Sequence, residues 1–232
     1  MIENDIRCIK VSDTGSCPFC YSNKIIKNGT TKTKKQQYIC KKCNRRFLDF
    51  YTYKAYYSNI NSLIIQFIKE GLGIRSTARI LKISVTTLLK RILMIAGNIK
   101  APILHFHKTY ELDEMRFFVR KKTNPIWLVY AIDRATKQIA NFYIGRRNNN
   151  TLNTVVKTLI NSKAQKIYTD KLRNYQYLIP KDIHITKRYE TNTIERKNLT
   201  LKTDLKRLSR KTICFSKSIT ITKAILIIYF WT

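Results

Sequence analysis

Four cysteines at regular spacing constrain the fold of this chain more than any other feature of its sequence. Cys17 and Cys20 form one C-x2-C pair, and Cys40 and Cys43 form a second, with nineteen residues between the two pairs. A two-residue gap lets both thiolates of a pair point at one ion, and two pairs complete a tetrahedron. The spacing therefore predicts a zinc ribbon or knuckle. The zinc is expected to be structural, because four thiolates leave no position open for a substrate.

The segment between the cysteine pairs, which includes NGTTKTKKQQY, predicts a β-hairpin. Asn28 and Gly29 are expected near its first turn, where such a dipeptide is favoured. Few apolar residues lie in this part of the sequence, so a hydrophobic core alone would not keep it folded. We therefore expect the metal to supply much of the folding free energy.

The charge of the chain points to a polyanionic partner. The sequence holds 45 Lys and Arg residues against 14 Asp and Glu residues, a formal net charge of +31. The excess is spread along the chain, so the folded surface must be positive, and each DNA phosphate that it neutralises would release condensed counterions. Double-stranded DNA is the expected partner. No basic amphipathic helix or lipidation motif favours a membrane surface instead.

The ends of the sequence predict neither export nor a membrane span. The first ten residues, MIENDIRCIK, lack the apolar core of a signal peptide. The C-terminal run SITITKAILIIYFWT is short for a bilayer and is interrupted by Lys223, so it predicts a buried closing helix or strand. We expect a cytoplasmic, nucleoid-associated protein whose cysteines are thiols or metal ligands rather than disulfides.

Helical periodicity begins near Asn61 and predicts a helix-turn-helix. After a first apolar stripe, Ser76 is expected to cap a short helix that ends near Leu81, and Ser84 to cap a second helix from Val85 to about Leu93. Two short helices joined by a tight segment are typical of this motif, although a plain helical hairpin is the alternative. The candidates for DNA contact are Arg75, Thr86, Thr87, Lys90 and Arg91, of which Lys90 and Arg91 are placed for phosphates.

The second half of the chain predicts a mixed α/β domain. YELDEMRFFV, WLVYAID and QIANFYIG indicate three successive strands, because β-branched and aromatic residues are frequent in them. A helix is expected over 151–160, and a short strand, KIYTD, ends on Asp170. A later helix is expected over 193–207, with Glu195 in its first turns.

Acidic residues are scarce, yet ELDEM, residues 111–115, holds three of them. Asp113, Asp170 and Glu195 are the candidate metal ligands, since they lie on a strand, at a strand end and on a late helix. Carboxylate oxygens suit hard cations, and three of them in a positive groove could hold two Mg²⁺ or Mn²⁺ ions about 4 Å apart. Such ions activate the attacking oxygen and stabilise the leaving oxygen in phosphodiester cleavage.

The remaining acids have simpler interpretations. Asp133 is expected to cap a turn, and Asp204 to form a surface ion pair of little energetic weight. Glu111 and Glu114 could be exposed strand residues paired with lysines. Strand alternation places Glu114 on the face opposite Asp113 and Glu111 on the same face. Their functional roles stay open.

Five motifs of the chain stand out together: CPFC…YICKKC, GIRSTARILKIS, ELDEM…WLVYAIDRAT, IYTD and TIERKNLTLKTDLKRLSRKTICFSKS. In this combination they resemble the transposases of the bacterial insertion-sequence-one family. The resemblance runs from about Cys17 to Ser218. It implies a zinc-binding domain over 1–54, a helix-turn-helix domain over 55–100 and a catalytic domain of ribonuclease-H-like fold over 101–232. The expected fold class is therefore multi-domain α/β.

Matched to the motifs of that family, the DDE triad falls on Asp113, Asp170 and Glu195. The family's basic residue, seven positions after the glutamate, falls on Lys202, which shares a helix face with Glu195 and Asn198. Lys202 could grip a DNA phosphate, and Asn198 is a further candidate for DNA contact. The resemblance implies metal-dependent hydrolysis that frees 3′-hydroxyls at the terminal inverted repeats of the element, and then direct attack on target DNA. A homo-oligomer is expected, because two DNA ends must meet.

A second hypothesis is a non-catalytic DNA-binding repressor that uses only the zinc knuckle and the helix-turn-helix. The second half of the chain would then be a dimerisation domain, and substitution of its acids would change no activity. Convergence of the three carboxylates on one point would favour the transposase, because two-metal chemistry requires it.

Overall fold

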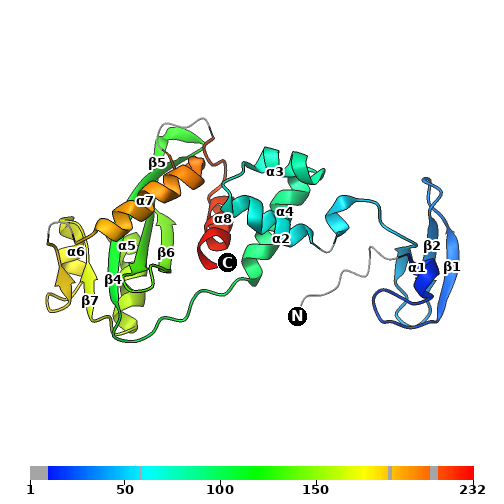
Figure 1. The fold of residues 1–232 in the computed structure, drawn as a ribbon, viewed down its shortest axis with the longest axis horizontal. Helices are drawn as coiled ribbons and strands as arrows, with labels where there is room; N and C mark the ends of the chain where they lie inside the picture. Colours follow the sequence, from blue (N-terminus) through cyan, green and yellow to red (C-terminus); the bar gives the residue numbers. More distant parts are fainter. Residues whose placement is uncertain (1–9, 58, 188–189, 210–213) are drawn as a thin grey trace. The chain divides into compact units, whose positions relative to one another are not determined.

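The computed structural model describes residues 10–57, 59–187, 190–209 and 214–232. The chain divides into two compact units (Figure 1). The first runs up to Ile64 and takes in Arg75–Leu88, and the second comprises Ile65–Ile74 and Leu89–Thr232. The helical region thus contributes to both units, whereas the cysteine pairs lie in the first unit and the candidate catalytic acids in the second.

The first unit contains a small antiparallel sheet. Its elements are α1 (Val11–Thr14), β1 (Ile25–Thr30), β2 (Gln36–Cys40) and β3 (Arg46–Leu48), and the strands pair in the order β1-β2-β3. Val11, Tyr38 and Phe47 are buried together with Cys17 and Cys40. This core is small and gathers round the cysteines, so cross-linking through the thiols would add much to its stability.

The hairpin predicted between the cysteine pairs is present, but its turn is not at Asn28 and Gly29. These residues lie within β1, at a point where its pairing with β2 shifts register. Gly29 has a φ of 74°, the left-handed conformation that glycine adopts readily at a bulge. The turn is formed instead by 31–35, where the Thr31 N–H donates to the Lys35 carbonyl at 2.9 Å.

The helical region consists of the 3₁₀ turn η2 (Lys54–Tyr56) and the helices α2 (Ile60–Lys69), α3 (Ile74–Leu81) and α4 (Val85–Asn98). The two predicted helices are present as α3 and α4, joined by 82–84. The prediction for Ser76 is wrong, because α3 begins at Ile74 and Ser76 lies inside the helix. α4 continues past the predicted end at Leu93. Lys82 has a φ of 52°, which turns the chain sharply between the helices.

Ser84 caps α4, as predicted. Its hydroxyl accepts from the Thr87 N–H at 3.0 Å and lies 2.8 Å from the Thr87 hydroxyl. Tyr53 closes the same corner, since its hydroxyl accepts from the Ser84 N–H and donates to the Thr87 hydroxyl, each at 3.1 Å. Local and non-local bonds therefore fix the first turn of α4.

Loss of this cap is expected to destabilise α4. Ser84→Ala removes the oxygen that accepts from Thr87, so the free energy of unfolding should fall by about 1 kcal/mol. Urea unfolding followed by helical circular dichroism measures the change. Ser84→Asn, which keeps an accepting oxygen, is the matched control; an equal loss in both variants would argue against capping.

The second unit is built on a five-stranded mixed sheet. Its strands are β4 (Thr109–Val119), β5 (Lys121–Asp133), β6 (Ile139–Gly145), β7 (Lys166–Tyr168) and β8 (His184–Ile185), in the order β6-β5-β4-β7-β8. β4, β5 and β6 are the three predicted successive strands and form an antiparallel meander, β7 adds parallel to β4, and β8 adds parallel to β7. The strand that carries ELDEM is therefore central, and its neighbour β7 ends shortly before Asp170.

Helices cover both faces of this sheet (Figure 1). α5 (Asn149–Asn161) packs on one face, where its Val155 shares a core with Val129 and Ala131 of β5. α7 (Asn192–Asp204) and α8 (Ile219–Trp231) lie on the other face. There the ring of Tyr130, which alternates with Val129 and Ala131, stacks 6.2 Å from the ring of Phe230 in α8.

Most elements predicted for the second half are confirmed, and two short ones are additional. The sequence pattern does not predict α6 (Arg173–Leu178) or β8, because six and two residues are too few to show a period. α7 ends at Asp204, before the 3₁₀ turn η3 (Lys206–Leu208), and α8 is the predicted closing helix. Across the described ranges, no helix combines the length and the apolar character needed to cross a membrane.

Candidate active site and metal centres

The parallel pairing of β4 with β7 brings Asp113 and Asp170 together. Glu111 lies opposite Tyr168 in this register, so Asp113 and Asp170 each follow that pair by two residues. Carboxylate oxygens of Asp113, Glu114 and Asp170 all lie within 4.8 Å of one another. Opposite ligands of one Mg²⁺ stand about 4.2 Å apart, so small shifts would let this group share a divalent cation.

Glu195, the third acid of the expected triad, is not part of that group. It lies in the first turn of α7, is exposed, and accepts a hydrogen bond from the Thr191 hydroxyl at 3.0 Å. Its helix nevertheless reaches the site, because Asn198 donates from Nδ2 to Asp113 Oδ2 at 2.6 Å. The structure thus brings two of the three acids together and places the third on a helix that contacts Asp113.

Asn198 is held by the sheet as well as by Asp113. The Tyr130 hydroxyl donates to Asn198 Oδ1 at 2.9 Å and lies 3.2 Å from the Ile194 carbonyl. Tyr130 is fully buried and pairs with Asp113 between β4 and β5. The amide group that the sequence suggested for DNA contact is therefore engaged in orienting Asp113. Lys202, further along α7, is half-buried.

Burial and neighbouring acids disfavour the ionised form of Asp113. Desolvation is the largest influence, and the charges of Glu114 and Asp170 add to it, so the pKa of Asp113 rises from 3.8 to about 6. The Glu114 N–H, 2.7 Å from Asp113 Oδ1, and the Asn198 amide offset only part of this rise. A divalent cation would reverse the penalty, because its charge favours the carboxylate.

Glu111 and Glu114 are not exposed beside lysines, as the sequence allowed, but buried and bonded to arginines. Glu111 is 0% exposed and Glu114 is 9% exposed. Glu111 binds Arg134 at 3.1 Å, and Glu114 binds Arg147 at 2.5 Å. The predicted alternation is confirmed, because Glu111 bonds to α7 on the Asp113 face whereas Glu114 bonds to α6 on the opposite face.

Two further acids have structural partners. Asp133 caps the turn after β5, as predicted, since its Oδ1 accepts from the N–H groups of Ala135 at 2.8 Å and Thr136 at 3.2 Å. The prediction of a surface ion pair for Asp204 is wrong: within the described segments it makes no ion pair, is half-buried, and accepts a hydrogen bond from the Tyr229 hydroxyl. Neither acid belongs to the group round Asp113.

The two cysteine pairs converge in the first unit. The Sγ atoms of Cys17 and Cys43 lie 3.7 Å apart, those of Cys20 and Cys40 lie 3.5 Å apart, and all four lie within 4.8 Å of one another. Sulfurs at the corners of a tetrahedron with 2.3 Å metal bonds are about 3.8 Å apart, so the arrangement fits a zinc ion. Each close contact joins the two pairs, which a shared ion would lock together.

Backbone N–H groups favour a thiolate at Cys40. Burial alone would raise the pKa of Cys40, but the N–H groups of Cys43 and Lys42, together with the neighbouring thiols, outweigh burial and lower this pKa to about 6. The Ser22 N–H lowers the pKa of Cys20, yet burial and the other thiols raise it to about 12. One thiolate therefore forms readily, and a cation is needed to ionise the whole set.

The DNA-contact candidates of the helix-turn-helix differ in exposure. Thr87 and Arg91 are half-buried, and the Thr87 hydroxyl is engaged in the cap of α4. Arg75, Thr86 and Lys90 are exposed. These three side chains are therefore the more accessible to a nucleic acid.

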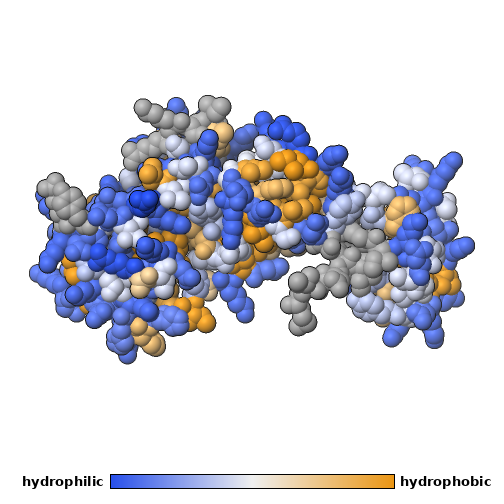
Figure 2. Space-filling model, in the orientation of Figure 1, coloured by the Kyte–Doolittle hydropathy of each residue, from blue (hydrophilic) through white to orange (hydrophobic). Residues whose placement is uncertain are grey.

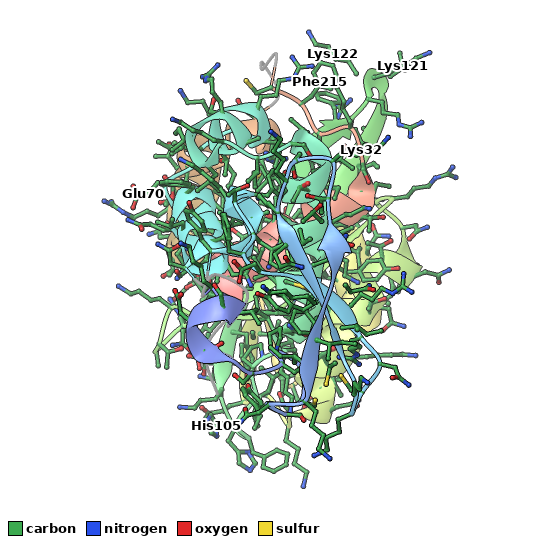
Figure 3. The ribbon with its side chains drawn as sticks, turned by 90° about the vertical axis from the view of Figure 1, so that its right-hand side faces the viewer. Lys32, Glu70, His105, Lys121, Lys122 and Phe215 are labelled. Carbon is green, nitrogen blue, oxygen red and sulfur yellow. The ribbon has the colours of Figure 1, made fainter. Side chains whose placement is uncertain are left out.

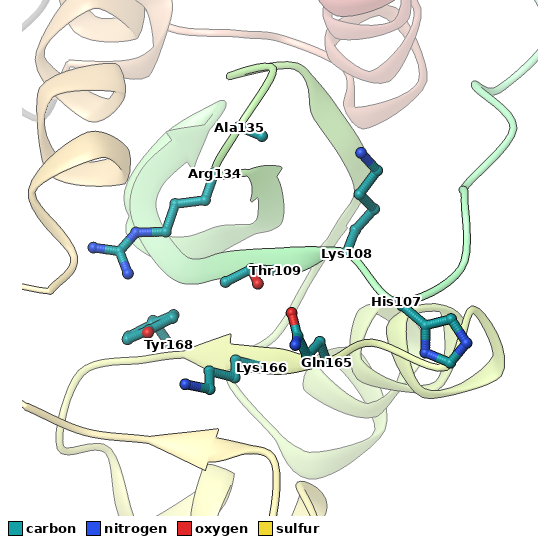
Figure 4. Close-up of a pocket in the computed structure, with 8 residues that line it drawn as sticks. All are labelled: His107, Lys108, Thr109, Arg134, Ala135, Gln165, Lys166 and Tyr168. Atoms are coloured by element: carbon teal, nitrogen blue, oxygen red, sulfur yellow. The ribbon is translucent and has the colours of Figure 1, made fainter.

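Basic side chains dominate the charged surface. Figure 2 shows hydrophilic residues over most of the face in view, and Figure 3 shows Lys121 and Lys122 reaching outward from the β4–β5 hairpin. A cavity of about 570 Å³ opens in the second unit beside the starts of β4 and β7 (Figure 4). Lys108, Arg134 and Lys166 line it, and its described lining holds no acid. The charge pattern suits phosphate groups.

Comparison with known proteins agrees with these features. Residues 108–231 match the family described as IS1 transposase, with its DDE domain, and residues 51–93 match the InsA C-terminal domain, a helix-turn-helix family. The first match covers the whole sheet with α5 to α8, and the second covers η2, α2, α3 and part of α4.

Similar proteins come from other insertion elements. The insertion element iso-IS1n protein InsB of Shigella dysenteriae is 38% identical over 116 residues, which is 50% of this chain and 88% of that protein. The insertion element IS1 2 protein InsB of Escherichia coli strain K12 is 34% identical over 109 residues, 47% of this chain and 65% of that protein. With more than half of its residues matched, the chain belongs to the IS1 transposase family.

Proposed function

We propose that this transposase binds the terminal inverted repeats of its insertion sequence, frees 3′-hydroxyls by metal-dependent hydrolysis and joins them to target DNA. Asp113, Asp170 and Glu195 are the proposed catalytic acids. The observation that carries the proposal is the approach of two carboxylates, that of Asp113 on β4 and that of Asp170 just beyond the end of the parallel strand β7. Mg²⁺ or Mn²⁺ held there would activate the attacking oxygen and stabilise the leaving oxygen.

The other side chains of the site would orient these acids and the DNA. Asn198 and Tyr130 hold the Asp113 carboxylate in one orientation, which supports its role as a ligand. Glu195 would join from α7, the helix that Asn198 ties to Asp113. Lys202, two turns after Glu195, would contact a phosphate of the strand being cut.

The strand order supports a ribonuclease-H-like fold for 101–232. An antiparallel meander is followed by two parallel strands, the central strand carries the first acid, and helices cover both faces. We assign 1–54 to a zinc-binding domain and 55–100 to a helix-turn-helix domain. The convergent thiols support zinc in the first of these.

DNA recognition is proposed to use the helix-turn-helix together with the basic surface. Thr86, at the start of α4, would contact base edges, and Arg75 and Lys90 would contact phosphates. Thr87 and Arg91, which are half-buried, would lie behind these exposed side chains. Because strand transfer needs two DNA ends, we expect a homo-oligomer on DNA. A protein with this substrate would work in the cytoplasm, at the nucleoid.

Purified protein incubated with labelled element ends should cleave them in Mg²⁺ or Mn²⁺ and not in EDTA. Asp113→Asn, Asp170→Asn and Glu195→Gln should each lower cleavage and strand transfer about a thousandfold, because loss of a metal ligand removes several kcal/mol of transition-state stabilisation. Separation of the DNA products on denaturing gels measures both steps.

Asp182→Asn is the matched control, since it removes one exposed carboxylate outside the acid group. Its cleavage should equal that of the unsubstituted protein. Retained cleavage in a triad variant would overturn the assignment of that acid. Binding of element ends without cleavage under any metal condition would favour the repressor hypothesis.

A further inference from the structure

Two buried carboxylates flank Asp113 on β4, and the proposed reaction uses neither. Glu111 is fully buried, and the side chain of Glu114 is 2% exposed. Burial of an ionised carboxylate costs several kcal/mol, and a well-packed apolar residue in its place often stabilises a fold as well or better. Stability alone does not account for two such groups beside one catalytic acid. Each of them is bonded to a segment that carries another part of the site.

Glu111 fastens α7 to the sheet. Its Oε2 accepts from the Ile194 N–H, in the first turn of α7, at 2.8 Å. The N-cap residue of that helix, Thr191, makes no capping bond of its own, so Glu111 supplies from β4 the acceptor that the helix start lacks. Its negative charge also suits the positive end of the helix dipole. Glu111 therefore holds α7, and with it Glu195 and Asn198, in position against β4.

Arg134 ties the same carboxylate to β7. Its Nε donates to Glu111 Oε1 at 3.1 Å, and its terminal nitrogen donates to Glu190 at 2.6 Å. The guanidinium lies over the Tyr168 ring, 4.2 Å from the centroid, at one side of the cavity in Figure 4. Tyr168 is the last residue of β7, two positions before Asp170. One arginine thus links β4, β7 and the chain that leads into α7.

Glu114 fastens α6 from the opposite face of the sheet. The buried hydroxyl of Tyr175, in α6, donates to Glu114 Oε2 at 2.8 Å, and Arg147 donates twice to Oε1, at 2.9 and 2.5 Å. The chain enters α6 from Asp170, whose Oδ1 accepts from the Leu172 N–H at 3.0 Å. Glu114 therefore holds the segment that carries Asp170 against β4.

Glu114 lies close enough to Asp113 and Asp170 to share a cation with them, but both of its carboxylate oxygens already accept hydrogen bonds. A guanidinium and a buried phenol donate to them, and the guanidinium neutralises the charge. A cation would have to displace this charge-assisted pairing before it could bind Glu114. The contacts therefore suit a residue that supports metal ligands more than a ligand.

We propose that Glu111 and Glu114 are positioning residues, which hold the segments bearing Glu195 and Asp170 against Asp113 from opposite faces of the sheet. The proposal rests on the proposed function, because it takes the triad acids as metal ligands. Its structural half, that each acid fastens one particular segment, is measurable without DNA.

Substitution of Glu111 should loosen only α7, and substitution of Glu114 should loosen only α6. In Glu111→Leu, the Ile194 amide and the first turn of α7 should exchange hydrogen faster while α6 keeps its protection, and Glu114→Leu should show the reverse. Hydrogen exchange of the full chain measures both helices at once. Glu111→Gln and Glu114→Gln, which are isosteric and uncharged, should give the same pattern at smaller amplitude if the leucine variants do not fold. Equal losses in both helices would overturn the assignment.

Mn²⁺ affinity tests the link to the metal ligands. Glu111→Gln and Glu114→Gln should each weaken Mn²⁺ binding about tenfold, the lower end of the loss seen when a residue that orients metal ligands is changed. Asp113→Asn should abolish this binding, and Asp182→Asn should leave it unchanged. Water proton relaxation during a Mn²⁺ titration of the full chain reports affinity without any cleavage.

Each of the other possible results of the Mn²⁺ titration would contradict a different part of the proposal. Unchanged Mn²⁺ affinity in both Gln variants, with lower melting temperatures, would make Glu111 and Glu114 stabilising residues only and overturn the proposal. A loss in Glu114→Gln as complete as that in Asp113→Asn would make Glu114 a ligand. Mn²⁺ binding that survives Asp113→Asn would contradict the proposed function, whatever hydrogen exchange shows for Glu111 and Glu114.

Discussion

Asp113→Asn should make the metal-free protein more stable while it lowers cleavage about a thousandfold. The ionised Asp113 carboxylate is held beside Glu114 and Asp170 and away from water, which raises its pKa to about 6. At pH 7 this costs about 3 kcal/mol of stability, at 1.36 kcal/mol for each pKa unit. An amide has one accepting oxygen where the carboxylate has two, and the lost bond takes back about 1 kcal/mol. The net gain should be about 2 kcal/mol.

The pH dependence of stability checks the cause. The folded pKa of about 6 lies above the ordinary value of 3.8, so between these values the folded chain binds more protons than the unfolded chain. The contribution of Asp113 to stability is therefore present at low pH, is lost as pH rises through this window, and stays lost above it. Asp113→Asn should remove this slope.

Melting temperatures of both proteins from pH 4 to pH 8, in EDTA and then in Mg²⁺, provide the measurement. Mg²⁺ should stabilise the unsubstituted protein above about pH 6, where Asp113 is ionised, and should leave Asp113→Asn unchanged. A variant that is less stable than the unsubstituted protein at every pH would show that Asp113 is not strained by its neighbours.

Removal of the proposed zinc ion from the cysteine site should unfold segment 10–50 of the first unit and leave the second unit folded. The buried side chains beside the cysteines are few, and four thiols packed within 4.8 Å gain little from one another without a cation. Structural zinc contributes about 10 kcal/mol or more of apparent folding free energy in small domains. Cys40→Ser or chelation should therefore expose 10–50 to limited proteolysis while the sheet of the second unit stays protected.

Cys214→Ser is the matched control, because it removes an exposed thiol outside the four-cysteine cluster. It should retain one zinc ion per chain by metal analysis and the protease resistance of the unsubstituted protein. A chelated protein in which 10–50 still resists proteolysis would show that the small core is sufficient and that the metal is dispensable for folding.

Pattern in the sequence was enough to single out the candidate metal ligands, because the spacing of Cys17, Cys20, Cys40 and Cys43 and the strand alternation round Asp113 are local properties. It was not enough to find the partners of Glu111 and Glu114. Their arginines stand 23 and 33 positions away along the chain, and only the pairing of strands brings them near.

Two local sequence signals led to wrong predictions, because each of them is compatible with two different structures. The dipeptide Asn-Gly is favoured in tight turns because glycine readily adopts a left-handed conformation. A β-bulge uses the same conformation, and Gly29 lies at a bulge. Ser76 has the side chain of a helix cap, but Ile74 and Arg75 extend α3 ahead of it. A single sequence does not rank such alternatives, because tertiary packing decides between them.

The register of β4 and β7 has a consequence for mutation at the level of the gene. In each segment, one spacer residue, Leu112 or Thr169, separates the Glu111–Tyr168 pair from the proposed catalytic acid. Loss of one codon within either spacer would turn that acid to the other face and shift it by about 3.3 Å. A codon gained or lost at the exposed tip of the turn between β1 and β2, 32–34, would only alter a loop. The gene is therefore expected to tolerate a change of length in that turn and to be inactivated by the same change in the two spacers.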